Sequence, residues 1–197
     1  MSLAQRIQQQ FTDSIQTKQT ALAALAAPLE AATRLMAGTL RVGGKIMACG
    51  NGGSGAGAQP LAPRPLHRSA KKKPPLAAIA LTTDTSTLTS IANDYRYEDV
   101  FAKQVQALGR RGDVLLAIST SGNSPNVIEA IHVAHAQGVR VVALTGKQGG
   151  KMAALLAADD IHLCVPAERT ARIQEVHLLA IHCLCDGIDT LMLGENP

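Results

Sequence analysis

The chain has 197 residues, the size of one α/β domain, and 46% of them are hydrophobic while only 2% are aromatic. With no Trp, two Tyr and two Phe, it lacks the stacking side chains used by modules that bind single-stranded nucleic acid. The net charge of +4 comes from five basic residues in the segment 60–75, without which basic residues no longer outnumber the 15 acidic ones. We therefore expect an aliphatic core and no direct binding of nucleic acid.

The cysteines and the N-terminus indicate the compartment. The cysteines are too few and too unevenly spaced for a secreted disulfide framework, and none form a C-x-x-C pair: Cys49, Cys164, Cys183 and Cys185. No apolar run approaches the roughly 20 residues of a membrane span. The first ten residues are too polar for a signal peptide. We expect mostly buried, reduced thiols and a soluble, cytoplasmic protein that does not bind membranes.

In chain order, the pattern changes from helical to alternating. Residues 3–40 predict two helices, because Leu3, Ile7, Phe11 and Ile15 recur at helical spacing and Pro28 marks a break. Short apolar runs then predict strands at 45–49, 76–81, 113–118, 140–144 and 160–165. Helical spacing appears at 97–108, 126–137 and 170–193.

Short buried strands that alternate with helices favour a parallel, doubly wound sheet. The sequence contains no internal repeat and no linker between domains. We therefore predict a single domain over 1–197, with a helical lead at 1–40 and an α/β core at 41–197.

Three loops at the ends of predicted strands have a composition suited to ligand binding: 49–54, 119–124 and 145–150. The second, the serine loop, offers the hydroxyls of Ser119, Thr120, Ser121 and Ser124 in front of a helix N-terminus, a good cradle for phosphate. The third is either another binding edge or only a turn. Neither the P-loop nor the dinucleotide-binding pattern is present, so a small phosphorylated ligand fits best.

These segments resemble a known family. CGNGGS at 49–54, ISTSGNSPNV at 118–127 and TARIQEVHLLAIHCLCDGID at 170–189 are similar to the sugar isomerase (SIS) domain, as are the segments at 80–95 and 143–153. Within that family the chain resembles the bacterial phosphoheptose isomerases and their non-catalytic relatives of the DiaA type. The resemblance implies a flavodoxin-like three-layer αβα sandwich and a homotetramer in which the helical lead packs against neighbouring subunits.

The resemblance also implies roles for particular residues. It assigns phosphate contacts to the four hydroxyls of the serine loop and zinc to one site per subunit. Gln174 would contact both metal and sugar, and His182 would be a zinc ligand or an acid/base residue. The two lie eight residues apart, about 80° around a helix axis, so both can face one cavity. The remaining substrate contacts would come from two other loops: Asn51, Gly52, Gly53, Ser54, Asn93 and Asp94.

Other histidines have simpler interpretations. His177 follows Gln174 by three residues and is expected to be structural. His132 and His135 are expected on the surface or in packing contacts, and His162 has no evident partner.

One segment departs from the family. The resemblance implies a helix after the first glycine loop whose His and Glu complete the zinc site, the Glu also acting as base, but this chain has Pro60 and Arg64 there. Proline offers no ligand, and a guanidinium stays protonated. Pro60, Pro63 and Pro65 would also break that helix, at about 3 kcal/mol each. Three interpretations stay open: a local sequence error, a diverged inactive relative, or a new basic binding loop.

The resemblance therefore leaves two functions. The first is isomerisation of sedoheptulose 7-phosphate to D-glycero-D-manno-heptose 7-phosphate, a precursor for lipopolysaccharide heptose. Activity of this chain would depend on the substituted positions. The alternative is a non-catalytic tetrameric scaffold that binds the replication initiator DnaA, which the loss of His and Glu favours and the retained His182 opposes.

Overall fold

A five-stranded parallel sheet forms the centre of the protein. The computed structural model describes residues 1–59 and 76–193. The strands are β1 (Ile46–Gly50), β2 (Ala78–Ala80), β3 (Val114–Ser119), β4 (Arg140–Thr145) and β5 (Ile161–Cys164), in the spatial order β2-β1-β3-β4-β5. All neighbouring strands are parallel. The five predicted strands and the doubly wound arrangement are confirmed, and the order is that of flavodoxin-like folds.

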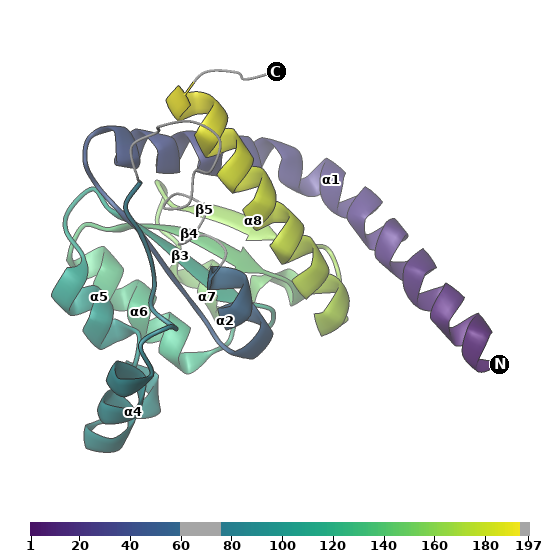
Figure 1. Ribbon diagram of the computed structural model, residues 1–197, viewed down its shortest axis with the longest axis horizontal. Coiled ribbons are helices and arrows are strands. Elements are labelled where there is room, and N and C mark those ends of the chain that lie inside the picture. The colour runs from purple at the N-terminus through teal and green to yellow at the C-terminus, as the bar shows by residue number, and fades with distance from the viewer. Residues whose placement is uncertain (60–75, 194–197) are drawn as a thin grey trace.

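Helices cover both faces of the sheet (Figure 1). Alternate residues of each strand point to opposite faces, so that Leu116 packs in one apolar layer and Leu115 in the other. One layer lies under α1 (Leu3–Arg41), α2 (Gly52–Ala58) and α8 (Thr170–Leu193). The opposite layer lies under α5 (Ala102–Leu108), α6 (Pro125–Ala136) and α7 (Gly150–Leu155). The three-layer prediction is therefore confirmed.

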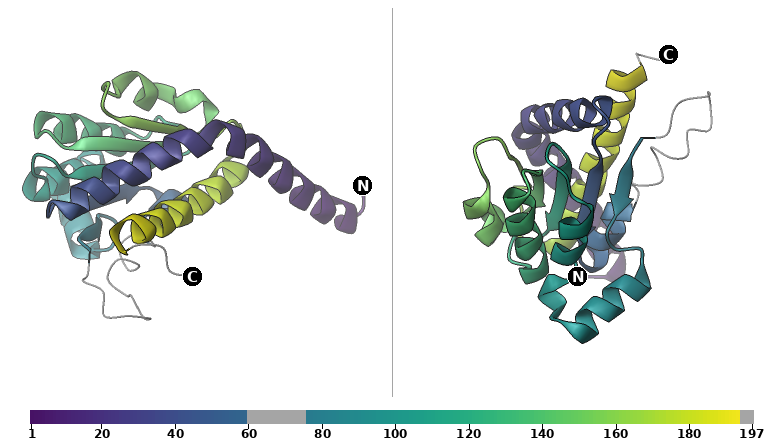
Figure 2. Two further views of the ribbon diagram at one scale, coloured as in Figure 1. Left: turned by 90° about the horizontal axis from the view of Figure 1, so that it is seen from above. Right: turned by 90° about the vertical axis from the view of Figure 1, so that its left-hand side faces the viewer.

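The N-terminal segment differs from the prediction of two helices. It forms the single 39-residue helix α1, which contains Pro28 and is bent rather than broken (Figure 2). A proline inside a helix removes one hydrogen bond and favours a bend. The Ala-rich second half of α1 continues past the bend because it is held against α8 through buried residues such as Leu25 and Met36. The first half projects away from the sheet (Figure 1).

Some other elements were not predicted. These are α2, α7, α4 (Thr85–Asp94) and the 3-10 turn η3 (Lys147–Gly149). The helix predicted over 97–108 is divided into the 3-10 turn η2 (Tyr97–Asp99) and α5. No helix in the described part of the chain is long and apolar enough to cross a membrane. Two of the cysteines, Cys49 and Cys185, are buried as expected, whereas Cys183 is exposed.

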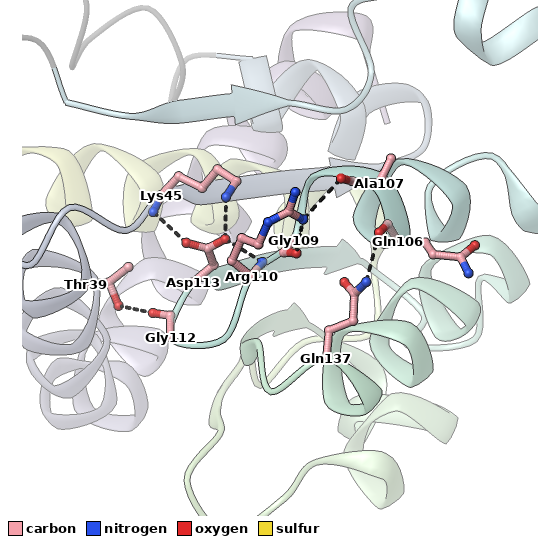
Figure 3. A network of polar contacts seen from close by, with 9 residues as sticks. All are labelled: Thr39, Lys45, Gln106, Ala107, Gly109, Arg110, Gly112, Asp113 and Gln137. Atoms are coloured by element: carbon pink, nitrogen blue, oxygen red, sulfur yellow. Dashed lines mark hydrogen bonds and ion pairs between the residues drawn. The ribbon is translucent and has the colours of Figure 1, made fainter.

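The amino ends of β1 and β3 are joined by a buried carboxylate (Figure 3). Asp113 directly precedes β3 and is only 2% exposed. Its Oδ1 accepts a hydrogen bond from the Lys45 backbone amide at 2.9 Å, and its Oδ2 accepts from the Arg110 amide at 2.8 Å and from Lys45 Nζ. Because Lys45 directly precedes β1, this network ties the amino ends of two neighbouring strands together.

Candidate functional site

The candidate site lies at the carboxyl ends of β1 and β3, where the connections from two adjacent strands leave toward opposite faces. β1 leads into α2 on one face and β3 leads into α6 on the other. In open α/β sheets such a switch point is where ligands bind. Two amides bridge it: Asn51 and Asn126 each donate to the other's side-chain oxygen at 2.8 Å. Tyr97 also donates to Asn51, at 3.4 Å. The two loops are therefore held together as one structure.

The serine loop gathers its hydroxyls at this point. Ser119 Oγ and Ser124 Oγ lie 2.8 Å apart, and Ser121 Oγ lies 3.5 Å from Ser119 Oγ and accepts from the Asn123 amide. Ser124 is the N-cap residue of α6, but its side chain makes no capping hydrogen bond. Since serine at this position usually caps the helix, its hydroxyl and the helix N-terminus both stay available for an anion. Thr120 is half-buried beside them.

A cavity of about 430 Å³ adjoins the loops, between α2 and α8. Gly53 and Ser54 line one side, and Gln174 lines the other. The Gln174 amide packs so closely on Gly53 that any side chain at position 53 would overlap it. Gly52 begins α2 with a φ of 50°, a conformation that favours glycine. The structure thus brings together the first glycine loop and Gln174, two parts of the chain to which the family resemblance assigns substrate contacts.

His182 and His177 occupy different positions on α8. His182 is half-buried and is not among the residues that line the cavity, although its neighbour Ile181 is. His177 lines the cavity and is only 3% exposed. Its Nε2 donates to the Thr145 carbonyl oxygen at 3.0 Å, and its buried Nδ1 has no partner among the described residues. This contact ties α8 to the end of β4, so His177 has the structural contact that was expected and also faces the site.

Burial also decides the ionisation of two groups near the site. Desolvation lowers the pKa of His177 to about 4, so its ring is neutral at physiological pH. Burial raises the pKa of the Cys49 thiol in β1 to about 12, which rules out a reactive thiolate there.

Asn93 and Asp94 lie at the exposed end of α4, where Asn93 Nδ2 donates to Asp94 Oδ1 at 2.9 Å. None of their hydrogen bonds within the described residues reaches the serine loop or the amide bridge. Their predicted contact with substrate stays a prediction.

The described residues, 1–59 and 76–193, do not form a zinc site by themselves. Pro60 and Arg64 lie outside the described residues, and neither residue type is a zinc ligand. Among the residues that the structure describes, no three His, Cys, Asp or Glu side chains come together in a way that can hold a metal ion. Gln174 and His182 alone supply two of the four ligands of a usual site.

The site contains residues that the sequence did not single out. Asn126, Tyr97 and Glu175 each contact the cavity or the amide bridge. Asn126 lies inside the quoted serine motif, but its partner is 75 residues away, and only the fold brings the two together.

The chain is similar in sequence to a known domain family and to known proteins. Residues 10–146 match the SIS domain model. Phosphoheptose isomerases from Azoarcus sp. and Aromatoleum aromaticum are 63% and 65% identical to the chain over 194 residues, 98% of each protein.

Solved structures of two phosphoheptose isomerases have the same fold. A phosphoheptose isomerase from Francisella tularensis has a TM-score of 0.95 at 44% identity, covering 96% of this chain and all of that one. The phosphoheptose isomerase GmhA from Neisseria gonorrhoeae has a TM-score of 0.90 at 53% identity with the same coverage. The chain therefore belongs to the SIS-domain family and, within it, to the phosphoheptose isomerases.

Proposed function

We propose that this protein is an aldose–ketose isomerase that converts sedoheptulose 7-phosphate to D-glycero-D-manno-heptose 7-phosphate. The serine loop at the switch point carries this proposal. The hydrogen bond between Ser119 and Ser124 uses only one of their two O–H groups, and the further contact of Ser119 with Ser121 Oγ, at 3.5 Å, is long enough for a phosphate oxygen to replace it. Binding the phosphate there holds the distant reacting end of the sugar in the cavity. The reacting carbons are thereby oriented toward the groups that act on them, which lowers the barrier of the reaction.

The reaction moves one proton between neighbouring carbons. A base removes the proton beside the carbonyl, an enediol forms, and the proton returns to the adjacent carbon. We assign the binding of the sugar hydroxyls to Gln174, whose amide lines the cavity. We assign proton transfer to His182, the remaining acid/base group of the family on α8. His182 does not line the cavity in this structure, so this role requires its side chain to turn toward the sugar in the complex.

Glu175 is a poor candidate for the base, although it lines the same cavity. One carboxylate oxygen accepts a hydrogen bond from Arg172 and the other accepts from Ser14 at 2.6 Å. Both oxygens are therefore engaged, one within α8 and the other in linking α8 to α1. The carboxylate that the family uses as base falls at Arg64 in this sequence, so we expect the chain to turn over slowly.

The direct test is conversion of sedoheptulose 7-phosphate followed by NMR, with and without added zinc. Peptide mass spectrometry of the same sample across residues 59–75 establishes which residues are present. Turnover is expected, and a folded sample that gives none under either condition would reject the isomerase assignment for this chain. In the variant with Pro60→His, Arg64→Glu, Pro63→Ala and Pro65→Ala, we expect kcat to rise at least ~100-fold, because a base is restored.

The sequence at positions 60 and 64 also supports a second candidate function, a non-catalytic scaffold. A protein without the base retains its fold and its ligand site but performs no chemistry. In that case the chain would bind the replication initiator DnaA. A pull-down that recovers no DnaA at micromolar concentration would exclude this candidate.

We further propose that the protein is a homotetramer that works in the cytoplasm and is assembled through α1. The projecting half of α1 exposes Leu3, Ile7, Phe11 and Ile15, and Phe11 is 68% exposed. The four side chains lie on one face of the helix, because they are spaced four residues apart. An apolar stripe of this length favours burial against further copies of the chain. Light scattering checks the mass: a tetramer is expected, and a monomer would contradict the proposal.

A further inference from the structure

The glycine-rich segment after β4 has an unusual backbone. Lys147, Gln148, Gly149 and Gly150 have φ angles of 50°, 64°, 90° and 55° in succession. Two of these residues are not glycine, and a side chain in this region costs free energy. Such a conformation persists only where the surroundings impose it. The segment is therefore more than a simple turn.

One side of this segment fits against the serine loop. Gly146 N donates to the Thr120 carbonyl at 3.1 Å, and Met152 N donates to the Gly122 carbonyl at 2.9 Å. Lys151 N donates to the Asn123 side-chain oxygen, also at 2.9 Å. The serine loop is thus hydrogen-bonded to the segment at three successive places.

The fit is also steric. Gly122 has a φ of 65°, and a methyl group on it would overlap the Gly149 carbonyl oxygen. A methyl group on Gly150 would overlap the Ser121 carbonyl oxygen. Both overlaps are with backbone atoms, which cannot rotate away as a side chain can. The close contacts Gly122–Gly149 and Gly150–Ser121 therefore set the distance between the segments.

The other side of the segment is anchored in the core. Lys147 N donates to the Ala167 carbonyl at 3.1 Å. Gly149 is buried against the ring of His162, whose Nε2 lies 2.6 Å from Thr145 Oγ1. His162, a residue of β5 for which the sequence suggested no partner, thus contacts both the end of β4 and the segment. The segment is fixed on one side and contacts the serine loop on the other.

We infer that residues 146–152 are a positioning element for the phosphate site, which holds Ser119, Ser121 and Ser124 at the spacing a phosphate requires. This inference rests on the proposed function, because it takes the phosphate of the sugar as the ligand. It assigns a role to the third loop, which contacts the serine loop through Gly122 and Asn123 and makes no direct bond to the ligand.

The test compares two glycine variants. Gly122→Ala introduces both backbone strain and the overlap with Gly149. Gly138→Ala is the matched control, since Gly138 has a similar φ of 71° but its neighbour is the flexible side chain of Arg111, far from the serine loop. Calorimetry measures the dissociation constant for inorganic phosphate, and a thermal melt reports stability.

We expect Gly122→Ala to weaken phosphate binding at least ~10-fold, because small displacements of positioned groups are costly, while Gly138→Ala binds like wild type. Unchanged phosphate binding in a folded Gly122→Ala protein would overturn the inference. If that variant does not fold, Asn123→Ala decides: it removes the acceptor for Lys151 N together with the hydrogen bond that Asn123 Nδ2 donates to the Ser121 carbonyl at 3.0 Å, and we expect binding to weaken ~3-fold. Unchanged binding there would likewise overturn it. Wild-type protein that binds neither phosphate nor the sugar phosphate would reject the proposed function itself.

Discussion

Polar groups at the two ends of the central sheet differ in how fully they are hydrogen-bonded within the chain. At the amino end, the carboxylate of Asp113 is buried and accepts hydrogen bonds from Lys45 and Arg110, all within the chain. At the carboxyl end, Ser119 and Ser124 bond mainly to each other, and the helix that follows is left without a side-chain cap. The amino end is closed by its own contacts, whereas the carboxyl end keeps hydrogen-bonding capacity for a ligand.

This difference separates stability from binding. A buried charge without partners is costly, so the Asp113 network contributes to the fold only while it is complete. Hydroxyls that keep a free donor contribute less to the fold and more to recognition. Substitutions at the amino end should therefore change the free energy of unfolding. Substitutions at the carboxyl end should change the affinity for the phosphorylated ligand.

The largest effect is expected at the amino end. Asp113→Ala leaves Lys45 Nζ and two backbone amides without their acceptor, so the free energy of unfolding should fall by about 3–5 kcal/mol. Urea denaturation measures it. The control is Glu30→Ala, which removes the exposed Glu30–Arg34 pair and should cost under about 1 kcal/mol. A similar small loss in both variants would remove the distinction between the two ends.

The next largest effect is expected on the pH dependence of stability, through His177 near the carboxyl end of the sheet. The pKa of His177 is about 4 in the folded protein, below its ordinary value of 6.5, so the unfolded chain binds the extra proton first. Stability that is complete above pH 6.5 should therefore decline by about 3 kcal/mol as pH falls to 4.

His177→Gln should flatten this decline, since Gln has no proton to gain in that range and still can donate to Thr145. His132→Gln is the control, because His132 is exposed. Urea denaturation at pH 7, 6 and 5 compares the three proteins. An equal slope in His177→Gln and wild type would show that another group causes the decline.

The contrast between the ends also explains what the sequence could predict. The strands and the serine loop follow from short apolar runs and local hydroxyl clusters, so the ends of all five strands were predicted within two residues. The continuous α1 was missed because tertiary packing on α8 outweighs the local effect of Pro28. The Asn51–Asn126 bridge and the contact between Gly122 and Gly149 join distant segments, which no local pattern contains.

The smallest effect is expected from one hydroxyl of the serine loop. Ser124→Ala should weaken binding of sedoheptulose 7-phosphate about 10-fold, the value of a hydrogen bond to a charged group. Its melting temperature should hardly change, because Ser124 does not cap α6.

Ser2→Ala provides the converse control. Ser2 caps α1 by accepting from Gln5 N, so its loss should lower stability by up to about 1 kcal/mol and leave affinity unchanged. Calorimetry and thermal melts on both variants complete the comparison. A loss of stability without a loss of affinity in Ser124→Ala would contradict the assignment of the serine loop to the ligand.

The most direct measurement is the melting temperature of the full chain with sedoheptulose 7-phosphate and, separately, with unphosphorylated sedoheptulose at the same concentration. A ligand that binds the folded state stabilises it by RT ln(1 + [L]/Kd) and so raises the melting temperature. The serine loop at the carboxyl end predicts a rise with the phosphorylated sugar and little or none with the other. Equal shifts with both sugars, or none with either, would contradict a phosphate site at this end of the sheet.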